Sequence, residues 1–445
     1  MEKFKRIWFL ILLAVLFLPM MQTCFHLVDE RPLDGVAKKA KKPVVNRQTL
    51  YNEMAQDSLL KWCTEQTGFR NTMIRVNNQL LFSVYGKVPN TGIVRSKDRN
   101  NYFGTRYVLS YTGESFLGEE EIQKRVRRLK VAQDILLTKG VTVVSVFTLG
   151  KASYYSELIP DKYLAKGRET NNYNAFLEAF AEQGINVIDF NRYLCDRKDT
   201  EIYPYYSNLS THWTAYAASL AMDSLVHYME SKTKKTHVHA VIESFDTTWI
   251  LQQDDEMSRN MNLIFPLEHN TIYEPVFSFT EGYKPKVLAI ADSYWWTVFN
   301  KKVNLPQTLF SNTGFWFYNN TINTERSSQK TVEELDYKKE IESQEFVLLV
   351  GTEASLDKWP YSFPERYLSA YDNVFRHKSV DQYDAADSLY LVFRNAEIKN
   401  TIQRIKESPQ WLENVTNSAK EKGIDMETAL WNAADYTYRT VMKPK

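Results

Sequence analysis

The chain has 445 residues, enough for two domains or for one elaborated α/β domain. Its 55 basic and 54 acidic residues leave a net charge of +1, which gives no reason to expect a nucleic-acid partner. The sequence has no His-Glu-x-x-His motif, no Walker loop, no Gly-rich dinucleotide fingerprint and no Cys/His cluster with zinc spacing. We therefore expect no metal and no cofactor.

An uncharged apolar segment lies near the N-terminus. Residues 7–28 contain no Asp, Glu, Lys or Arg, and three basic residues precede them: Lys3, Lys5 and Arg6. A run of roughly 20 apolar residues can just span a bilayer, although a cleaved signal peptide has a similar pattern. Because no small-x-small cleavage site ends the segment, we expect residues 1–28 to be a transmembrane anchor. The positive flank predicts a cytoplasmic N-terminus, with residues 29–445 outside the cytoplasm.

The next part of the chain is a linker followed by helices. Residues 29–46 are polar and basic, with four lysines between residues 38 and 42. Residues 47–85 have apolar residues at helical spacing, with a break at Gly68-Phe69-Arg70, and residues 86–118 are rich in turns. We expect a solvated spacer ahead of a folded domain.

Helices and strands alternate from residue 119 onward. Predicted helices cover 119–139, 173–183 and 214–232, and predicted strands cover 141–147, 185–189, 287–291, 346–350 and 389–393. This alternation predicts an α/β fold with a mainly parallel sheet and helices on both faces.

The C-terminal segment has a helical pattern. We expect the α/β domain to cover residues 47–397 and a helical extension to cover 398–445. The buried anchors predicted for this extension are Trp411, Leu412, Leu430 and Trp431.

A serine stands where a strand meets a helix-compatible segment. Asp292 and Ser293 directly follow the apolar residues 287–291, and Tyr294 comes next. At such a corner an α/β enzyme can expose a nucleophile, and the N–H groups of the next helix can face an oxyanion. Asp-Ser after an apolar run is also a common helix cap.

A second motif, Ser210-Thr211-His212-Trp213, lies 81 residues upstream of Ser293. A lone histidine before a helix is often a cap or a core hydrogen bonder, but a nucleophilic serine needs a nearby base. We therefore expect His212 and Ser293 to lie within about 4 Å of each other. Aromatic residues make up 14% of the chain, a surplus that either lines a carbohydrate or peptide groove or is ordinary core material. The residues that we expect to line a substrate groove are Trp213, Trp295 and Tyr154.

These motifs carry a resemblance to a known family. Residues 210–218 resemble the Asp-x-His-Trp motif of the alginate O-acetyltransferase family, the AlgX/AlgJ-like proteins with an SGNH-hydrolase-like domain. Residues 291–294 resemble that family's Gly-Asp-Ser-Phe motif. The order, with the histidine first, also agrees and is the reverse of that in ordinary SGNH hydrolases. The resemblance covers roughly residues 45–400.

The resemblance implies a periplasmic acyltransferase held at the inner membrane by its N-terminal helix. Its acetyl donor would be a membrane-bound O-acyltransferase, and its acceptor a polysaccharide hydroxyl. Ser293 would be the nucleophile that forms an acyl-enzyme, and His212 the base. Asp292 and Tyr294 would neighbour the oxyanion.

The sequence departs from the family at the triad carboxylate. That position is Ser210 here, and in serine proteases replacing the triad Asp by Asn costs about 10⁴ in turnover. Three outcomes stay open: another carboxylate reaches His212, the site is a slower dyad, or catalysis is lost. The candidate carboxylates are Asp189, Asp254, Asp255 and Glu353. The glycine of the serine motif is also replaced, by Ala291.

Two other functions compete with the transferase. A non-catalytic assembly or polysaccharide-binding protein of an exopolysaccharide machine fits the missing carboxylate. A carbohydrate acetyl esterase would form the same acyl-enzyme but would let water replace the sugar acceptor. Fold alone does not decide between these functions.

Overall fold

The computed structural model describes residues 2–35, 40–44, 46–51, 54–167, 170–300, 302–312, 314–323 and 330–442. The chain divides into two compact units. The first consists of Met1–Thr105, Ser207–Thr211 and Leu251–Asn270, and the second of Arg106–Tyr206, His212–Ile250 and Thr271–Lys445. Part of the predicted basic linker, including Lys38 and Lys39, lies outside the described residues.

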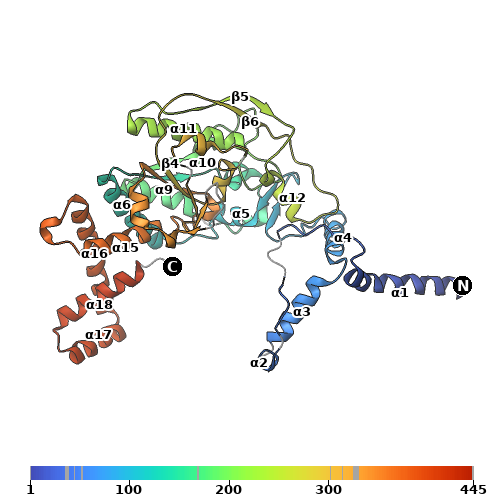
Figure 1. Cartoon of the computed structure of the whole chain (residues 1–445), viewed down its shortest axis with the longest axis horizontal. Coiled ribbons are helices and arrows are strands. Elements are labelled where there is room, and N and C mark those ends of the chain that lie inside the picture. The colour runs from blue at the N-terminus through green and yellow to red at the C-terminus, as the bar shows by residue number, and fades with distance from the viewer. Residues whose placement is uncertain are drawn as a thin grey trace. The chain divides into compact units, whose positions relative to one another are not determined.

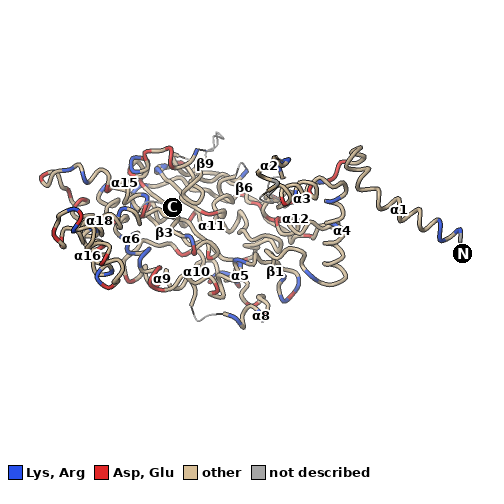
Figure 2. Tube along the Cα trace, turned by 90° about the horizontal axis from the view of Figure 1, so that it is seen from below, with Lys and Arg blue, Asp and Glu red and all other residues tan. Residues whose placement is uncertain are grey.

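The first unit begins with the apolar helix α1, Glu2–Phe25. Within the described residues, its stretch Lys3–Phe25 is the one helix long and apolar enough to cross a membrane. Figure 2 shows α1 as an almost uncharged tube whose basic residues gather at its N-terminal end. The uncharged span predicted from the sequence, residues 7–28, is thus helical up to Phe25.

The rest of the first unit is made of short elements. The predicted break in the helical region is confirmed, since Phe69 has φ of +58° between two helices. The turn-rich stretch 86–118 also contains a two-stranded antiparallel sheet and a helix, which the sequence did not predict. The elements are α2 Arg47–Tyr51, α3 Met54–Gln66, α4 Arg70–Ser83, β1 Ile93–Arg95, β2 Tyr102–Gly104, η2 Gln252–Asp255 and α12 Glu256–Asn260, with α5, Thr105–Tyr111, at the boundary.

The second unit is built on a seven-stranded sheet in the order β10-β9-β8-β7-β11-β3-β4. Strands β8, β7, β11, β3 and β4 run parallel, and β9 and β10 extend the β8 edge in antiparallel pairs. The predicted mainly parallel α/β sheet is confirmed. The strands are β3 Thr142–Phe147, β4 Val187–Asp189, β7 Val287–Ala291, β8 Phe315–Phe317, β9 Thr321–Asn323, β10 Lys330–Thr331 and β11 Phe346–Gly351.

Both faces of this sheet are covered. Every residue of β7 and of β11 is buried, as expected of parallel strands between two helical layers. Helix α6, Glu119–Thr138, packs near β3 together with α9, Asn172–Gln183. Three glutamates in the first turn of α6 favour helix formation there, because they lie at the positive end of the helix dipole.

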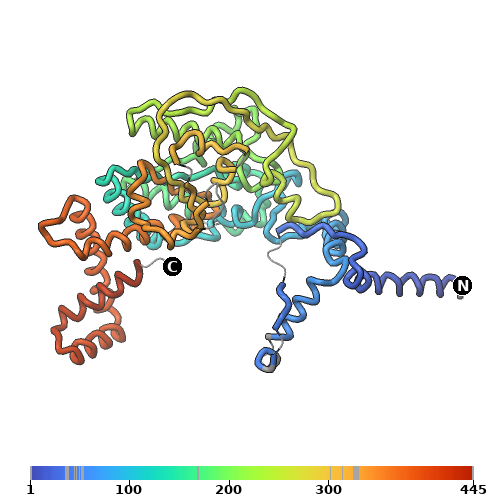
Figure 3. The backbone as a smooth tube through the Cα atoms, viewed as in Figure 1, coloured from blue at the N-terminus to red at the C-terminus, as the bar shows by residue number. Residues whose placement is uncertain are grey.

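The C-terminal segment is helical, as predicted, but it begins earlier. Residues 389–393 are not a strand: they lie inside α16, Ala385–Glu407, which packs on α6. Helices α17, Pro409–Lys422, and α18, Met426–Val441, follow and fold back on each other and on α16, as the orange and red trace in Figure 3 shows. Leu430 is buried, whereas Trp431 is exposed and therefore does not anchor this segment.

The C-terminal edge of the parallel strands carries the polar residues of interest. Strands β3, β7 and β11, together with β4, which Figure 1 labels, run parallel and all end at this edge, where α/β sheets place their sites. Asp292 and Ser293 follow β7, and Glu353 follows β11.

The antiparallel ribbon of β5, Ala240–Asp246, and β6, Glu274–Phe279, follows helix α11, Ala215–Thr233, in the same unit.

Candidate active site

Ser293 lies at a tight corner directly after β7. The carboxylate of Asp292 accepts a hydrogen bond from the Tyr294 N–H at 3.0 Å and caps the five-residue 3₁₀ helix η3, Ser293–Thr297. The cap interpretation therefore holds for Asp292, and the element that follows is shorter than the expected helix. The cap also occupies the N–H of Tyr294, so this group does not serve as an oxyanion donor.

His212 lies against Ser293. Its Nε2 is 2.9 Å from Ser293 Oγ, inside the separation of about 4 Å expected from the sequence. Both residues are half-buried. For the serine to donate its proton, Nε2 must be unprotonated, because neutral imidazole has one acceptor nitrogen.

Trp213 connects the histidine segment to the serine corner. Its indole Nε1 donates a hydrogen bond to the carbonyl oxygen of Tyr294 at 3.3 Å. The rings of His212 and Tyr294 lie 5.0 Å apart, and Thr214 caps α11 by accepting from the N–H of Ala217. Contacts on both sides of the Ser293–His212 pair thus hold together the two motifs, which are distant in sequence.

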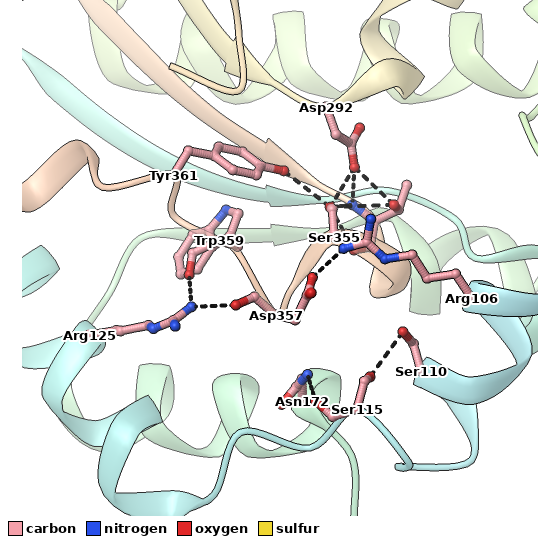
Figure 4. Close-up of polar contacts among 11 residues, drawn as sticks. Arg106, Ser110, Ser115, Arg125, Asn172, Asp292, Ser355, Asp357, Trp359 and Tyr361 are labelled. Atoms are coloured by element: carbon pink, nitrogen blue, oxygen red, sulfur yellow. Dashed lines mark hydrogen bonds and ion pairs between the residues drawn. The ribbon is translucent and has the colours of Figure 1, made fainter. Parts of the chain in front are cut away.

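Asp292 also fixes the corner to the end of β11 (Figure 4). Its Oδ2 accepts hydrogen bonds from the Thr352 N–H at 2.8 Å, the Thr352 hydroxyl at 2.9 Å and the Ser355 hydroxyl at 2.6 Å. Tyr361 lies 3.1 Å from Ser355 and extends this network. Asp292 is almost fully buried, and both of its carboxylate oxygens accept hydrogen bonds from the protein. We therefore infer that Asp292 positions Ser293.

The aromatic residues expected to line a groove are instead packed into the protein. Trp213, Trp295 and Tyr154 are only 3%, 4% and 6% exposed. Tyr294 is fully buried, its hydroxyl lies 3.4 Å from that of Tyr206, and burial raises the pKa of Tyr294 well above its ordinary value. These three aromatic residues belong to the core, so the prediction that they line a substrate groove is wrong.

The candidate carboxylates all have local partners. Asp189 accepts from the Tyr173 hydroxyl at 2.7 Å and caps α10, Phe190–Cys195. Asp254 accepts from the Leu251 N–H at 2.9 Å. Asp255 lies 2.7 Å from the guanidinium of Arg259. These contacts account for the three side chains as structural groups.

Glu353 stands apart from the other candidates. It is 3% exposed, and burial raises its pKa to about 7. One of its oxygens accepts hydrogen bonds from Ser153 and from Asn191, and the other has no hydrogen-bond partner among the described residues. A Cβ at Gly150 would come within 2.2 Å of the second oxygen, so this close approach requires glycine. Glu353 also lines a cavity of about 380 Å³.

Glu256 was not foreseen from the sequence. Its Oε1 accepts hydrogen bonds from the N–H and from the hydroxyl of Thr211, the residue before His212. Ser210, one residue further back, is fully buried. No motif links Thr211 to a glutamate 45 residues away, so only the fold reveals this contact.

The comparisons with known proteins agree with the motifs. Residues 109–271 match the family model described as ALGX, the SGNH hydrolase-like domain of the acetyltransferase AlgX. This segment includes His212 and ends before Ser293. Comparison with curated proteins finds no match.

Three solved structures are similar to the chain. The O-acetyltransferase domain of Pseudomonas putida AlgJ has 12% identity and a TM-score of 0.38, over 68% of this chain and 99% of its own. Pseudomonas aeruginosa AlgX has 16% identity and a TM-score of 0.40, over 60% and 66%. Bacillus cereus PatB1 has 10% identity and a TM-score of 0.36, over 60% and 98%. The family model confirms the resemblance first seen in the motifs: residues 109–271 of this chain are similar to the SGNH hydrolase-like domain of the acetyltransferase AlgX.

Proposed function

We propose that this protein is an O-acetyltransferase that moves an acetyl group onto a polysaccharide hydroxyl through an acyl-enzyme on Ser293. The observation that carries the proposal is the 2.9 Å distance between Ser293 Oγ and His212 Nε2 at the C-terminal edge of a parallel sheet. A serine hydroxyl is a weak nucleophile until a base takes its proton, and His212 lies where that base is needed. The family match supports acetyl transfer as the reaction class.

The reaction divides into two steps with one base. In the first, Ser293 Oγ bonds to the acetyl carbonyl carbon while His212 takes the hydroxyl proton and then gives it to the departing oxygen of the donor. In the second, His212 takes the proton of a sugar hydroxyl, whose oxygen attacks the acetyl group and releases Ser293. The same histidine returns its proton to the serine, so both steps balance without a cofactor.

The donor and the location belong to the same proposal. Helix α1 would hold the protein at the inner membrane with the SGNH-like domain in the periplasm, beside a membrane-bound O-acyltransferase that supplies the acetyl group. An anchored acceptor enzyme next to its donor gains effective concentration, because both partners are confined to one surface.

Acyl-enzyme formation tests the chemistry. Incubation with an activated acetyl ester should add one acetyl mass to the peptide that contains Ser293. Ser293→Ala should abolish the adduct, and His212→Ala should slow its formation by at least about 10²-fold. Ser311→Ala, at an exposed serine of the same unit, is the matched control and should label like the parent. Labelling that persists in Ser293→Ala would refute the proposal.

The fate of the acetyl group separates the transferase from the esterase. The acetylated enzyme, washed free of ester, should pass its acetyl group to an oligosaccharide faster than to water. Equal loss with and without oligosaccharide would favour the carbohydrate esterase. Failure of the parent to acylate at all would favour the non-catalytic assembly or polysaccharide-binding protein, for which the serine in place of the family's motif carboxylate, Ser210, is the supporting observation.

A further inference from the structure

Two histidines and two carboxylates form a cluster outside the acyl-transfer site. Asp223, His227 and Glu230 come from helix α11, and His239 comes from the segment that leads into β5. Residues spaced by four and three along a helix share one face, so the three α11 side chains point in the same direction. Asp223, His227 and His239 each offer one ligand atom within 4.8 Å of the others.

The two carboxylates of this cluster contact different nitrogens of the histidine rings. The carboxylate of Asp223 faces His239 Nδ1 at 3.1 Å and His227 Nε2 at 3.7 Å. The carboxylate of Glu230 faces the opposite nitrogens, His239 Nε2 at 3.1 Å and His227 Nδ1 at 3.1 Å. One carboxylate therefore lies with one nitrogen of each ring, and the other carboxylate holds the remaining nitrogen of each ring.

This arrangement matches a metal site in which one carboxylate binds the ion and a second carboxylate orients the histidine ligands. Histidine ligands usually donate their second ring N–H to a carboxylate, which fixes the ring orientation and the tautomer. Glu230 is in that position for both rings, and it is itself held by the N–H of His237 at 2.7 Å. The two imidazole rings lie side by side at a tilt of 42°, with centroids 4.5 Å apart, and one nitrogen of each ring lies within 4.8 Å of the other and of an Asp223 oxygen.

We propose that Asp223, His227 Nε2 and His239 Nδ1 bind one divalent transition-metal ion of the Zn²⁺ class, with Glu230 as the outer carboxylate. Zinc bonds nitrogen and oxygen at about 2.0–2.2 Å, so two ligands on a tetrahedral ion lie about 3.4 Å apart. Asp223 Oδ1 lies 3.1 Å from His239 Nδ1, and Asp223 Oδ2 lies 3.7 Å from His227 Nε2, so the carboxylate is close to that spacing from both nitrogens. Asp223 and His227 are 46% and 61% exposed at their side chains, which leaves the fourth position to water.

The site is distinct from the acyl-transfer centre. His212 precedes the N-terminus of α11, whereas His227 lies twelve residues into this helix, roughly 18 Å further along its axis. A metal there would tie α11 to the segment that enters the β5–β6 ribbon. The sequence did not indicate it because the three ligands follow no short zinc motif and one of them comes from a different element.

Metal titration of the full-length, tag-free protein in detergent tests the proposal. After removal of bound metal with a chelator, calorimetry with ZnCl₂ should show one equivalent bound. Co²⁺ should give the visible absorption bands of a four-coordinate ion. His227→Ala and Asp223→Asn should each weaken binding at least about 100-fold, and Glu230→Gln by about 10–100-fold, because it disturbs the outer shell only.

Controls separate this site from adventitious binding and from misfolding. His377→Ala, at an exposed histidine of the same unit, should leave Zn²⁺ affinity unchanged. His227 and Asp223 are exposed, so their variants should melt at the temperature of the metal-free parent. The proposal is overturned if the parent binds Zn²⁺ no more tightly than His227→Ala and Asp223→Asn do. The four side chains would then form an ion-pair cluster satisfied by protons alone.

Discussion

The carboxylate of Asp292 shows how a residue next to a nucleophile can matter without reacting. It accepts three hydrogen bonds from Thr352 and Ser355 and a fourth from the Tyr294 N–H, all in the interior. Hydrogen bonds to a buried charge contribute more than neutral ones, and a lost partner leaves donors unsatisfied. The serine corner therefore depends on this one side chain for its position.

Replacement of Asp292 by asparagine should separate position from chemistry. The amide presents a donor toward groups that already donate, so the free energy of unfolding should fall by about 3 kcal/mol, measured by urea denaturation. Acylation of Ser293 should fall as well. Asp196→Asn, an exposed carboxylate, is the control and should change stability by less than about 0.5 kcal/mol. Unchanged stability in Asp292→Asn would contradict the positioning role.

Ser210 is the residue at which this chain differs from the family's motif. Ser210→Asp should increase the rate of Ser293 acylation by an activated acetyl ester about tenfold or more, because a carboxylate stabilises imidazolium better than a hydroxyl does. Ser210→Asn has the same size without the charge and controls for disturbance of this buried position. No gain in the aspartate variant, together with a loss of acylation in Glu256→Gln, would assign the carboxylate role to Glu256.

At the scale of elements, long periodic segments were predictable and short ones were not. The helix at α6 and the strands β3, β7 and β11 could be read from the sequence because their patterns are long or uniformly apolar. Residues 389–393 show the limit. A five-residue apolar run fits a strand or a buried helix equally well. Here the segment is helical, because Asp384 caps α16 and the buried residues of α16 follow helical spacing.

The candidate site shows the same division between what was predictable and what was not. The proximity of His212 and Ser293 could be anticipated because a nucleophilic serine needs a base within hydrogen-bond reach. The burial of Trp213 and Trp295 could not be anticipated. The sequence suggested that they line a groove, and only the packing of the folded protein shows that they are covered. The contact of Glu256 with Thr211 also depends on long-range folding, which no local pattern encodes.

The loop after β11 should make stability depend on pH. The pKa of Glu353 is raised to about 7 by burial, from an ordinary value of 4.5, so the folded state keeps a proton that the unfolded state releases. Its contribution is therefore fully present below about pH 4.5 and is lost as pH rises through 7. Between pH 5 and pH 8 this residue alone should lower the free energy of unfolding by about 2 kcal/mol.

Glu353→Gln should remove this dependence. The variant keeps an oxygen that can accept from Ser153 and Asn191, and it should be more stable than the parent at pH 8 but not at pH 4. Urea denaturation at several pH values measures the difference. Glu178→Gln, an exposed glutamate of α9, is the control and should follow the parent curve. Parallel curves for the parent and Glu353→Gln would show that the pKa of Glu353 is the same in the folded and unfolded states.

At the scale of the whole molecule, the proposed location of the reaction outside the cytoplasm depends on α1. Its apolar span is preceded by basic residues and followed by the rest of the chain, an arrangement that orients a single-pass protein with its N-terminus in the cytoplasm. The proposed acceptor is a polysaccharide outside the cytoplasm. As a membrane anchor, α1 would by its orientation determine whether Ser293 faces that proposed acceptor.

A reporter active only in the periplasm, fused to the C-terminus, should be active, and protease added to spheroplasts should digest the protein beyond α1. Replacing Lys3, Lys5 and Arg6 with glutamate should lower that activity, because basic residues hold the N-terminus in the cytoplasm. Replacing Lys41 and Lys42, which follow the span, with glutamine controls for a general effect of charge removal and should leave the orientation unchanged. Membrane fractions washed with carbonate should retain the intact chain. Recovery of a soluble protein that starts near residue 25 would instead identify α1 as a cleaved signal peptide, and the acyl transfer would then take place without a membrane anchor.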